Sequence, residues 1–179
     1  MEAGHSREPS KVYENVQSLL NLGIVGINIE DSLVEDERKL TDATEFATLI
    51  AYLKNRLADE GRELFINART DTFVLDVPKA LIETVRRIKL YEDAGADGVF
   101  VPCITQAVDI QALVKNTSLP INVMCMPELP DFNALNDLGV KRISMGNFLF
   151  NKMVKNLENN LRSIVNNHSF GSVFSHENN

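Results

Sequence analysis

Charged side chains follow short apolar runs in this 179-residue chain, and they are the residues best able to do chemistry. Glu30 and Asp31 come directly after the apolar run 25–29, and Arg69 comes directly after 64–68. A carboxylate at such a place suits Mg²⁺, which prefers oxygen ligands and often keeps several waters. A guanidinium group fits a carboxylate or phosphonate with two parallel hydrogen bonds. The pattern favours a metal role for an acidic residue and an anion-binding role for Arg69.

Each of these residues also has a purely structural interpretation. Adjacent residues of a strand face opposite sides, so one of Glu30 and Asp31 is expected to point inward and the other into a helix layer. Asp31 or Ser32 could equally cap the following helix or loop. A partly buried Arg69 needs a partner, and a salt bridge to Asp71 or Glu30 would supply one. The residue types alone leave these alternatives open.

Other polar residues are weaker candidates. Asn122 interrupts an apolar run, so its amide must find hydrogen bonds, either to a substrate or to a neighbouring strand end. His5 lies close to Glu2, where metal binding, substrate binding and simple surface exposure all stay open. Cys103 and Cys125 are too few for a disulfide framework or a four-cysteine zinc site, and we expect them to pack as small apolar residues.

Five apolar runs and the longer segments between them define the elements that would position these side chains. The runs are rich in Val and Ile, as expected for strands buried on both faces of a parallel sheet. They predict strands at 25–29, 64–68, 98–101, 121–124 and 142–145. The other segments carry apolar residues at helical spacing, and several end at glycine. They predict helices at 9–22, 43–57, 78–94, 105–115, 131–138 and 148–165.

The strict alternation of strands and helices indicates an α/β fold with a parallel sheet. In the phrases AGADGVFVP, LGVKRISMG and LGIVGINIED a helix ends at glycine just before a strand, which favours a (β/α)₈ TIM-type barrel. A full barrel has eight units and typically about 250 residues, so we expect an incomplete barrel with about five βα units. The alternative is an open, doubly wound sheet. We expect a single domain over residues 1–179, with a frayed tail at 166–179.

Composition and charge narrow the class of protein. The net charge is −7, with 25 acidic and 18 basic residues, and an acidic surface disfavours nucleic acid and anionic lipid as partners. No apolar run approaches the length that crosses a bilayer. The polar N-terminus does not resemble a secretory signal. We therefore expect a cytoplasmic protein that binds neither nucleic acid nor membrane.

Six motifs together resemble a known family. EAGHSREP, GINIEDS, FINARTD, AGADGVFVP, LPINVM and GVKRISMGN are similar, in this order, to successive strand ends of the phosphoenolpyruvate mutase/isocitrate lyase superfamily, and most closely to its phosphonomutase-like branch. The resemblance extends over residues 2–165. Its most specific part is INIED followed by NARTD.

The resemblance implies a barrel enzyme that depends on Mg²⁺ or Mn²⁺. Its substrate would be a small 2-oxo or 2-hydroxy carboxylate related to pyruvate, and it would make or break a C–C or P–C bond next to an enolate. The metal would act as a Lewis acid on the enolate charge. Glu30 and Glu2 match metal-binding positions, and Arg69 matches the arginine that binds the substrate carboxylate. Asn122 is kept as a second substrate contact, and no catalytic acid or base is assigned.

The sequence also departs from the family pattern. The first acidic residue of the metal-binding loop would fall just before Met1, so we expect an N-terminally truncated barrel, and His5 and Ser6 replace the usual Tyr and Gly. SLVEDERKL lacks the Cys, Gly and His of the lyase loop, with Lys39 as a poor substitute, which argues against isocitrate cleavage. The alternative function is an inactive barrel fragment that serves for binding or oligomerisation, or a pseudogene product. Family members also imply a homo-oligomer.

Overall fold

The computed structural model describes residues 2–6, 8–34 and 36–174. These form two compact units, Met1–Ser144 and Met145–Asn179, which are described separately. The single domain expected over 1–179 stays a prediction.

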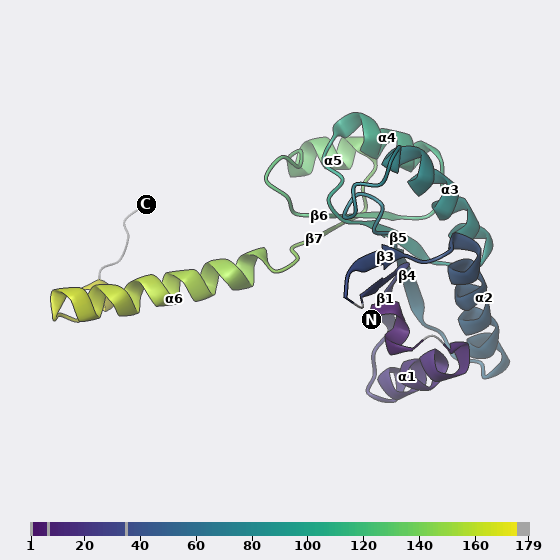
Figure 1. The fold of residues 1–179 in the computed structure, drawn as a ribbon, viewed down its shortest axis with the longest axis horizontal. Coiled ribbons are helices and arrows are strands. Elements are labelled where there is room, and N and C mark those ends of the chain that lie inside the picture. Colours follow the sequence, from purple (N-terminus) through teal and green to yellow (C-terminus); the bar gives the residue numbers. More distant parts are fainter. Residues whose placement is uncertain (1, 7, 35, 175–179) are drawn as a thin grey trace. The chain divides into compact units, whose positions relative to one another are not determined.

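The first unit is built on a parallel sheet of five strands (Figure 1). The strands are β1 (Gly26–Glu30), β4 (Phe65–Arg69), β5 (Gly98–Val101), β6 (Ile121–Met124) and β7 (Arg142–Ser144). They lie in the order β1-β4-β5-β6-β7, and every neighbouring pair is parallel. Strands of consecutive βα units are therefore adjacent in the sheet. This order confirms the expected barrel-type α/β architecture with five parallel strands. The sheet is open within the described residues, with β1 and β7 as its edges.

Helices cover one face of this sheet (Figure 1). They are α1 (Pro9–Asn21), α2 (Ala43–Asp59), α3 (Ala80–Asp93), α4 (Ala107–Lys115) and α5 (Phe132–Leu138), and a short 3₁₀ helix η1 (Glu2–His5) precedes them. Local sequence explains their ends. The Asp42 carboxylate accepts hydrogen bonds from the first-turn amides of α2, as an N-cap does. Gly139, with φ 93°, ends α5 in the left-handed conformation that glycine adopts most easily.

An antiparallel hairpin was not expected from the sequence. It joins β2 (Ser32–Val34) to β3 (Arg38–Leu40) and forms a separate two-stranded sheet between β1 and α2 in the chain. Its base is fixed by the Thr41 amide and hydroxyl, which both donate to the carbonyl oxygen of Asp31, at 2.8 and 3.0 Å. The hairpin therefore depends little on the hydrogen bonds of the main sheet.

The core lies between the sheet and its helices. In β1, Ile27 and Ile29 pack with residues of α1 and α2, and in β6, Ile121 and Val123 pack with residues of α4 and α5. Because side chains alternate along a strand, the intervening residues of these strands belong to the opposite face. That face carries the residues with candidate functions.

The second unit consists of α6 (Phe148–Asn167) and α7 (Gly171–Phe174). None of the described residues of α6 is buried. Large exposed apolar residues recur along α6 at helical spacing, namely Phe150, Met153, Val154, Leu157, Leu161 and Val165. The tail expected at 166–179 is helical at Gly171–Phe174, and 175–179 lie outside the described residues.

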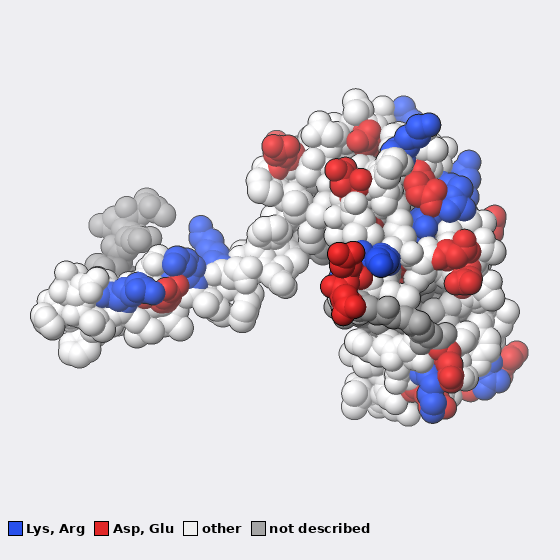
Figure 2. Space-filling model, viewed as in Figure 1, with Lys and Arg blue, Asp and Glu red and all other residues white. Residues whose placement is uncertain are grey.

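The surface carries charges of both signs. On the face drawn in Figure 2, acidic and basic side chains are interspersed, without a continuous basic patch among the described residues. Within the described part of the chain, no helix is long and apolar enough to cross a membrane.

Candidate active site

One row of residues crosses the sheet from the last residues of β1 and β4 to the first residue of β7. Backbone register places Glu30 of β1 beside Arg69 of β4, then Phe100, Asn122 and Arg142 on the next three strands. Three residues singled out from the sequence, Glu30, Arg69 and Asn122, thus share one row although they are far apart in the chain. The row lies on the side of the sheet opposite the helix-packed core.

Two carboxylates and two arginines form an ionic cluster at the β1 end of this row, called the inner cluster below. Arg69 donates from Nε to Asp71 Oδ1 at 2.6 Å, and its NH1 lies 3.1 Å from Glu30 Oε2. Arg38 of the hairpin donates from NH1 to Asp71 Oδ2 at 2.6 Å and to Glu30 Oε1 at 2.9 Å. Both carboxylates are buried, whereas each arginine side chain is 25% exposed. The charges balance, and both arginine side chains stay partly exposed.

Ser32 completes the inner cluster. Its hydroxyl donates to Asp71 Oδ2 and accepts from Arg38 NH1 at 2.8 Å. One nitrogen of Arg38 therefore lies within 2.9 Å of three oxygen atoms, which come from Glu30, Ser32 and Asp71.

The neighbouring carboxylate, Asp31, belongs to a second group, called the outer cluster below. Asp31 is fully buried, and its Oδ2 accepts from Tyr91 Oη at 2.6 Å and from Arg87 NH1 at 3.0 Å. Arg87 also donates to Glu83 Oε1 at 2.7 Å and to the Thr41 carbonyl at 3.0 Å. Tyr91 and Arg87 come from α3, so Asp31 faces the helix layer, as the alternation of strand residues requires of one of the two adjacent acids.

Burial dominates the proton affinities of the outer cluster. It raises the pKa of Tyr91, and Asp31 raises it further, so the phenol keeps its proton. It also raises the pKa of Asp31, while Tyr91 and Arg87 act in the opposite direction. For Arg87 burial alone would lower the pKa, but Tyr91 and Asp31 outweigh it and hold the pKa above its ordinary value.

Asn122 is the member of the row with unused hydrogen-bonding capacity. It is 2% exposed, and neither its Oδ1 nor its Nδ2 has a hydrogen-bond partner among the described residues. A buried amide without partners costs free energy. Its neighbours Phe100 and Arg142 in the register do not satisfy it.

The remaining sequence candidates are not brought into this site. Glu2 lies in η1, but its side chain is outside what the structure describes. The His5 side chain is exposed. Cys103 follows β5 in a left-handed backbone conformation with φ 65°; burial raises the pKa of its thiol, the charge of Asp71 raises it further, and Arg69 acts against both.

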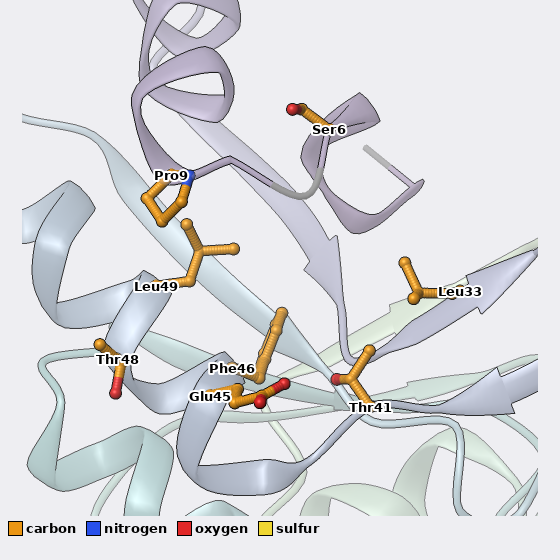
Figure 3. Close-up of a pocket in the computed structure, with 8 residues that line it drawn as sticks. All are labelled: Ser6, Pro9, Leu33, Thr41, Glu45, Phe46, Thr48 and Leu49. Atoms are coloured by element: carbon orange, nitrogen blue, oxygen red, sulfur yellow. The ribbon is translucent and has the colours of Figure 1, made fainter.

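A cavity of about 590 Å³ opens beside the hairpin (Figure 3). Leu33 and Thr41 line it from the hairpin side, and Phe46 and Leu49 line it from α2. Its lining in Figure 3 includes none of the charged residues of the inner cluster. The cavity thus lies next to the hairpin that carries Arg38.

The inner cluster offers the right atoms for a divalent cation but holds them in ion pairs. Carboxylate and hydroxyl oxygens are the hard ligands that Mg²⁺ prefers, and one or two protein carboxylates plus waters are enough. Glu30 and Asp71 fit that chemistry. Among the described residues no group of three acidic, His or Cys side chains is arranged to hold a metal. The fit therefore depends on freeing these carboxylates from Arg38 and Arg69.

Sequence reasoning missed two arginines. Arg87 carried a readable signal, because it shares a helix face with the buried Thr84, Ile88 and Tyr91. A charged residue on such a stripe needs a buried partner. Arg38 gave no such signal, since it lies in a polar segment whose pairing could not be predicted. For Arg69, the structure shows the structural alternative, with salt bridges to both Glu30 and Asp71.

Two curated relatives illustrate what the chain resembles. An uncharacterised protein of Mycobacterium tuberculosis (strain ATCC 25618 / H37Rv) is 38% identical over 146 residues, which is 82% of this chain and 52% of that protein. The oxaloacetate decarboxylase of Pseudomonas fluorescens (strain SBW25) is 31% identical over 159 residues, which is 85% of this chain and 53% of that enzyme. The chain thus spans about half the length of the curated relatives it matches.

Solved structures agree in fold. A Burkholderia cenocepacia J2315 crystal structure, provisionally described as a phosphonomutase, matches with a TM-score of 0.82 and 34% identity over 90% of this chain and 68% of that one. A phosphonopyruvate hydrolase in complex with oxalate and Mg²⁺ matches with a TM-score of 0.80 and 23% identity over 97% of this chain and 62% of that one. The family model for phosphoenolpyruvate phosphomutase matches residues 1–165. With that match over most of its length and the same parallel α/β fold, the chain belongs to the phosphoenolpyruvate phosphomutase family.

Proposed function

We propose that this chain carries the carboxylate-binding part of an active site for a small 2-oxo or 2-hydroxy carboxylate. The reaction class is lyase, mutase or decarboxylase chemistry at a C–C or P–C bond next to an enolate, with Mg²⁺ or Mn²⁺ as the cofactor. The observation that carries the proposal is the position of Arg69, held at the end of a strand beside two buried carboxylates and still 25% exposed.

Arg69 is oriented before any ligand arrives. Its Nε and NH1 face Asp71 and Glu30, and its guanidinium carbon lies 5.7 Å from the centre of the Phe100 ring. No described residue accepts a hydrogen bond from its NH2. A guanidinium group fixed on one edge and stacked on an aromatic ring loses little freedom when a carboxylate binds to it.

Asn122 is the second proposed substrate contact. It shares the row with Arg69, and its buried amide has both a donor and an acceptor to offer. A substrate oxygen accepting from Nδ2 would remove the cost of an unsatisfied amide.

The metal would be held by Glu30, with Glu2 as the proposed second acidic ligand. When bound, it would supply Lewis-acid stabilisation of the negative charge that develops on an enolate oxygen. Two residues of the chain would position the substrate and exclude water. Arg69 would orient the carboxylate, and the apolar Phe100 beside it would limit access of water. No residue is proposed as the general acid or base.

The relatives support this substrate class without fixing one substrate. One is an oxaloacetate decarboxylase, and one solved structure is a phosphonopyruvate hydrolase with oxalate and Mg²⁺. Oxaloacetate, phosphonopyruvate and oxalate all have adjacent carbonyl-type oxygens that could approach a cation and an arginine together. The alternative of an inactive binding fragment has no feature of the described residues in its favour.

The first test measures oxalate binding. Calorimetric titration of the 179-residue chain with oxalate and Mg²⁺ should show binding, and Arg69→Lys should raise the Kd by about tenfold or more, a loss of about 1.4 kcal/mol. Lysine keeps the charge but not the two-pronged geometry. Arg162→Lys, on the exposed α6, is the matched control. An absence of oxalate binding, or an unchanged Kd in the Arg69 variant, would contradict the proposal.

A second test separates the two kinds of bond. Oxaloacetate decarboxylation yields pyruvate and CO₂, whereas phosphonopyruvate hydrolysis consumes water and yields pyruvate and phosphate. Measuring CO₂ and phosphate separately, with the Arg69 variant as the background control, would assign the chemistry. The homo-oligomer and the cytoplasmic location expected from the sequence stay predictions.

A further inference from the structure

Asp31 holds the segment that carries Arg69 and Asp71 at two points. Its backbone amide donates to the Arg69 carbonyl oxygen at 3.0 Å, and its Oδ1 accepts from the Asp71 amide at 3.0 Å. Between these two bonds, the Thr70 amide donates to the Phe100 carbonyl oxygen at 3.0 Å. The backbone that sets the direction of the Arg69 and Asp71 side chains is therefore fixed at three successive residues.

Tyr91 fixes the carboxylate that makes one of these bonds. Its Oη donates to Asp31 Oδ2 at 2.6 Å, and Arg87 NH1 donates to the same oxygen at 3.0 Å. Burial raises the pKa of Tyr91, so the phenol keeps the proton that it donates. With Oδ2 held from α3, Oδ1 stays directed at the Asp71 amide. All three side chains of this group are buried, and hydrogen bonds shielded from water are stronger than those at the surface.

Asp71 passes this constraint to the partly exposed arginine. Its Oδ1 accepts from Arg69 Nε at 2.6 Å, so the plane of the guanidinium group follows the position of the Asp71 carboxylate. A chain of hydrogen bonds thus runs from Tyr91 through Asp31 and Asp71 to Arg69. It begins at a fully buried phenol in the helix layer and ends at a side chain that is 25% exposed.

We propose that Tyr91 is a positioning residue for Arg69, and that it acts through Asp31 and Asp71 to hold the guanidinium group in the orientation that receives a substrate carboxylate. This inference rests on the proposed function for the role of Arg69. A carboxylate that binds through two parallel hydrogen bonds depends on the plane of the guanidinium group, so a rotation of that plane weakens both bonds.

The phenol oxygen of Tyr91 can be removed without removing its ring. The ring packs edge-on against Phe46, with the ring centres 5.0 Å apart, and Tyr91→Phe keeps this packing. Arg87 keeps its ion pair with Asp31 in the variant, at 3.0 Å in the unaltered chain. Tyr91→Phe is therefore expected to fold and to differ from the unaltered chain mainly in the bond to Asp31 Oδ2.

NMR measures how firmly Arg69 is held, without any ligand. The bond to Asp71 protects the Arg69 Nε–H proton from exchange with water, and the signal is identified by its absence in Arg69→Lys. We expect Tyr91→Phe to speed this exchange by about threefold or more, because loss of one hydrogen bond loosens the next in the chain. The matched control is Tyr13→Phe, which removes a buried phenol that donates to the Arg56 carbonyl oxygen at 3.3 Å. It should leave the exchange unchanged.

Calorimetric titration with oxalate and Mg²⁺ measures the consequence for binding, at a temperature at which all forms are folded. We expect Tyr91→Phe to raise the Kd by about threefold, and Tyr13→Phe to bind oxalate as the unaltered chain does. A purely structural role of Tyr91 would lower stability and leave both the Kd and the Arg69 exchange rate unchanged. Either unchanged value in Tyr91→Phe overturns the inference, provided that the unaltered chain binds oxalate.

Hydrogen exchange of the unaltered chain gives a readout that does not depend on the folding of a variant. Asp71 follows the end of β4, yet its amide should exchange as slowly as the amides of β4, because Asp31 holds it. Exchange as fast as that of an unprotected loop amide would also overturn the inference. Failure of the proposed function looks different: the unaltered chain then binds no oxalate, or Arg69→Lys binds it equally well. In that case the exchange rates of Arg69 and Asp71 still decide whether Tyr91 positions Arg69.

Discussion

Glu30 and Asp31 are neighbours in the chain, yet they serve ionic clusters of opposite character. Asp31 in the outer cluster is fully buried, and its partner Arg87 is 6% exposed and tied to α3 and the hairpin base. Glu30 in the inner cluster meets two arginines that are each 25% exposed and that come from β4 and the hairpin. The difference teaches that a closed cluster holds elements together, whereas an open one keeps groups that a ligand can still recruit.

The largest loss of stability is expected at Asp31, which is the fully buried carboxylate of the outer cluster. Asp31→Asn removes the negative charge that pairs with the buried Arg87 and accepts from Tyr91. Breaking a buried ion pair in this way lowers the free energy of unfolding by about 3–5 kcal/mol. Urea unfolding should show this loss relative to the unaltered chain. Asp36→Asn, at an exposed position of the hairpin, is the control and should change stability by less than about 0.5 kcal/mol. A small loss in the Asp31 variant would mean that the outer cluster is not structural.

Asp71 joins the two clusters, so its replacement should have an intermediate effect. Its carboxylate meets Arg38, Arg69 and Ser32, while its backbone amide donates to Asp31 Oδ1 at 3.0 Å. Asp71→Asn keeps the hydrogen bond from its backbone amide to Asp31 but loses the ion pairs with Arg38 and Arg69. We expect the free energy of unfolding in urea to fall by about 2 kcal/mol. A cost as large as that of Asp31→Asn would erase the distinction between the clusters.

Glu30→Gln should cost about 1 kcal/mol, because its arginine partners can recover hydration when the charge is removed. The same change should weaken Mn²⁺ binding by the chain by about tenfold or more, since the proposed metal ligand loses its charge. Unfolding and metal titration of the Glu30 variants measure the two effects. Retained metal affinity would exclude Glu30 from the site, and a stability loss near that of Asp31→Asn would make it structural.

The smallest effect concerns Cys103. The charge of Asp71 is one cause of its raised pKa, so Asp71→Asn should lower that pKa and increase the thiolate fraction at a given pH. We expect alkylation of Cys103 at pH 8 to become about two- to threefold faster. Peptide mapping separates Cys103 from Cys125, which serves as the internal control. A slower reaction would show that the Asp71 charge does not reach the thiol.

The sheet could be predicted from the sequence because parallel strands that are buried on both faces have nearly continuous apolar sequences. No end of the five expected strands differs from the observed end by more than one residue, as with 25–29 against Gly26–Glu30. The hairpin could not be predicted, since β2 and β3 are three residues each and the segment between them is polar. Local pattern carries little information about such short pairings.

Part of the candidate site could be predicted because the apolar runs also show where each strand ends. Strand ends mark a functional edge, which led to Glu30 and Arg69, and backbone register then places them side by side. Alternation predicted that Glu30 and Asp31 face opposite ways, but not which of them meets the helices. Arg38 reaches the cluster through a tertiary contact of the hairpin, and no spacing in the sequence encodes that contact. The roles of Glu2, Glu30, Arg69 and Asn122 stay predictions.

The alternation at the end of β1 has a consequence for how this fold can diverge. Deleting one residue within β1 would turn every following side chain to the other face. Asp31 would then take the place of Glu30 beside Arg69, and the uncharged Ser32 would face Arg87 in the helix layer. Both clusters would fail in a single step. We therefore expect a change of length within β1 to be far more damaging than a change of length in a loop such as the turn between β2 and β3.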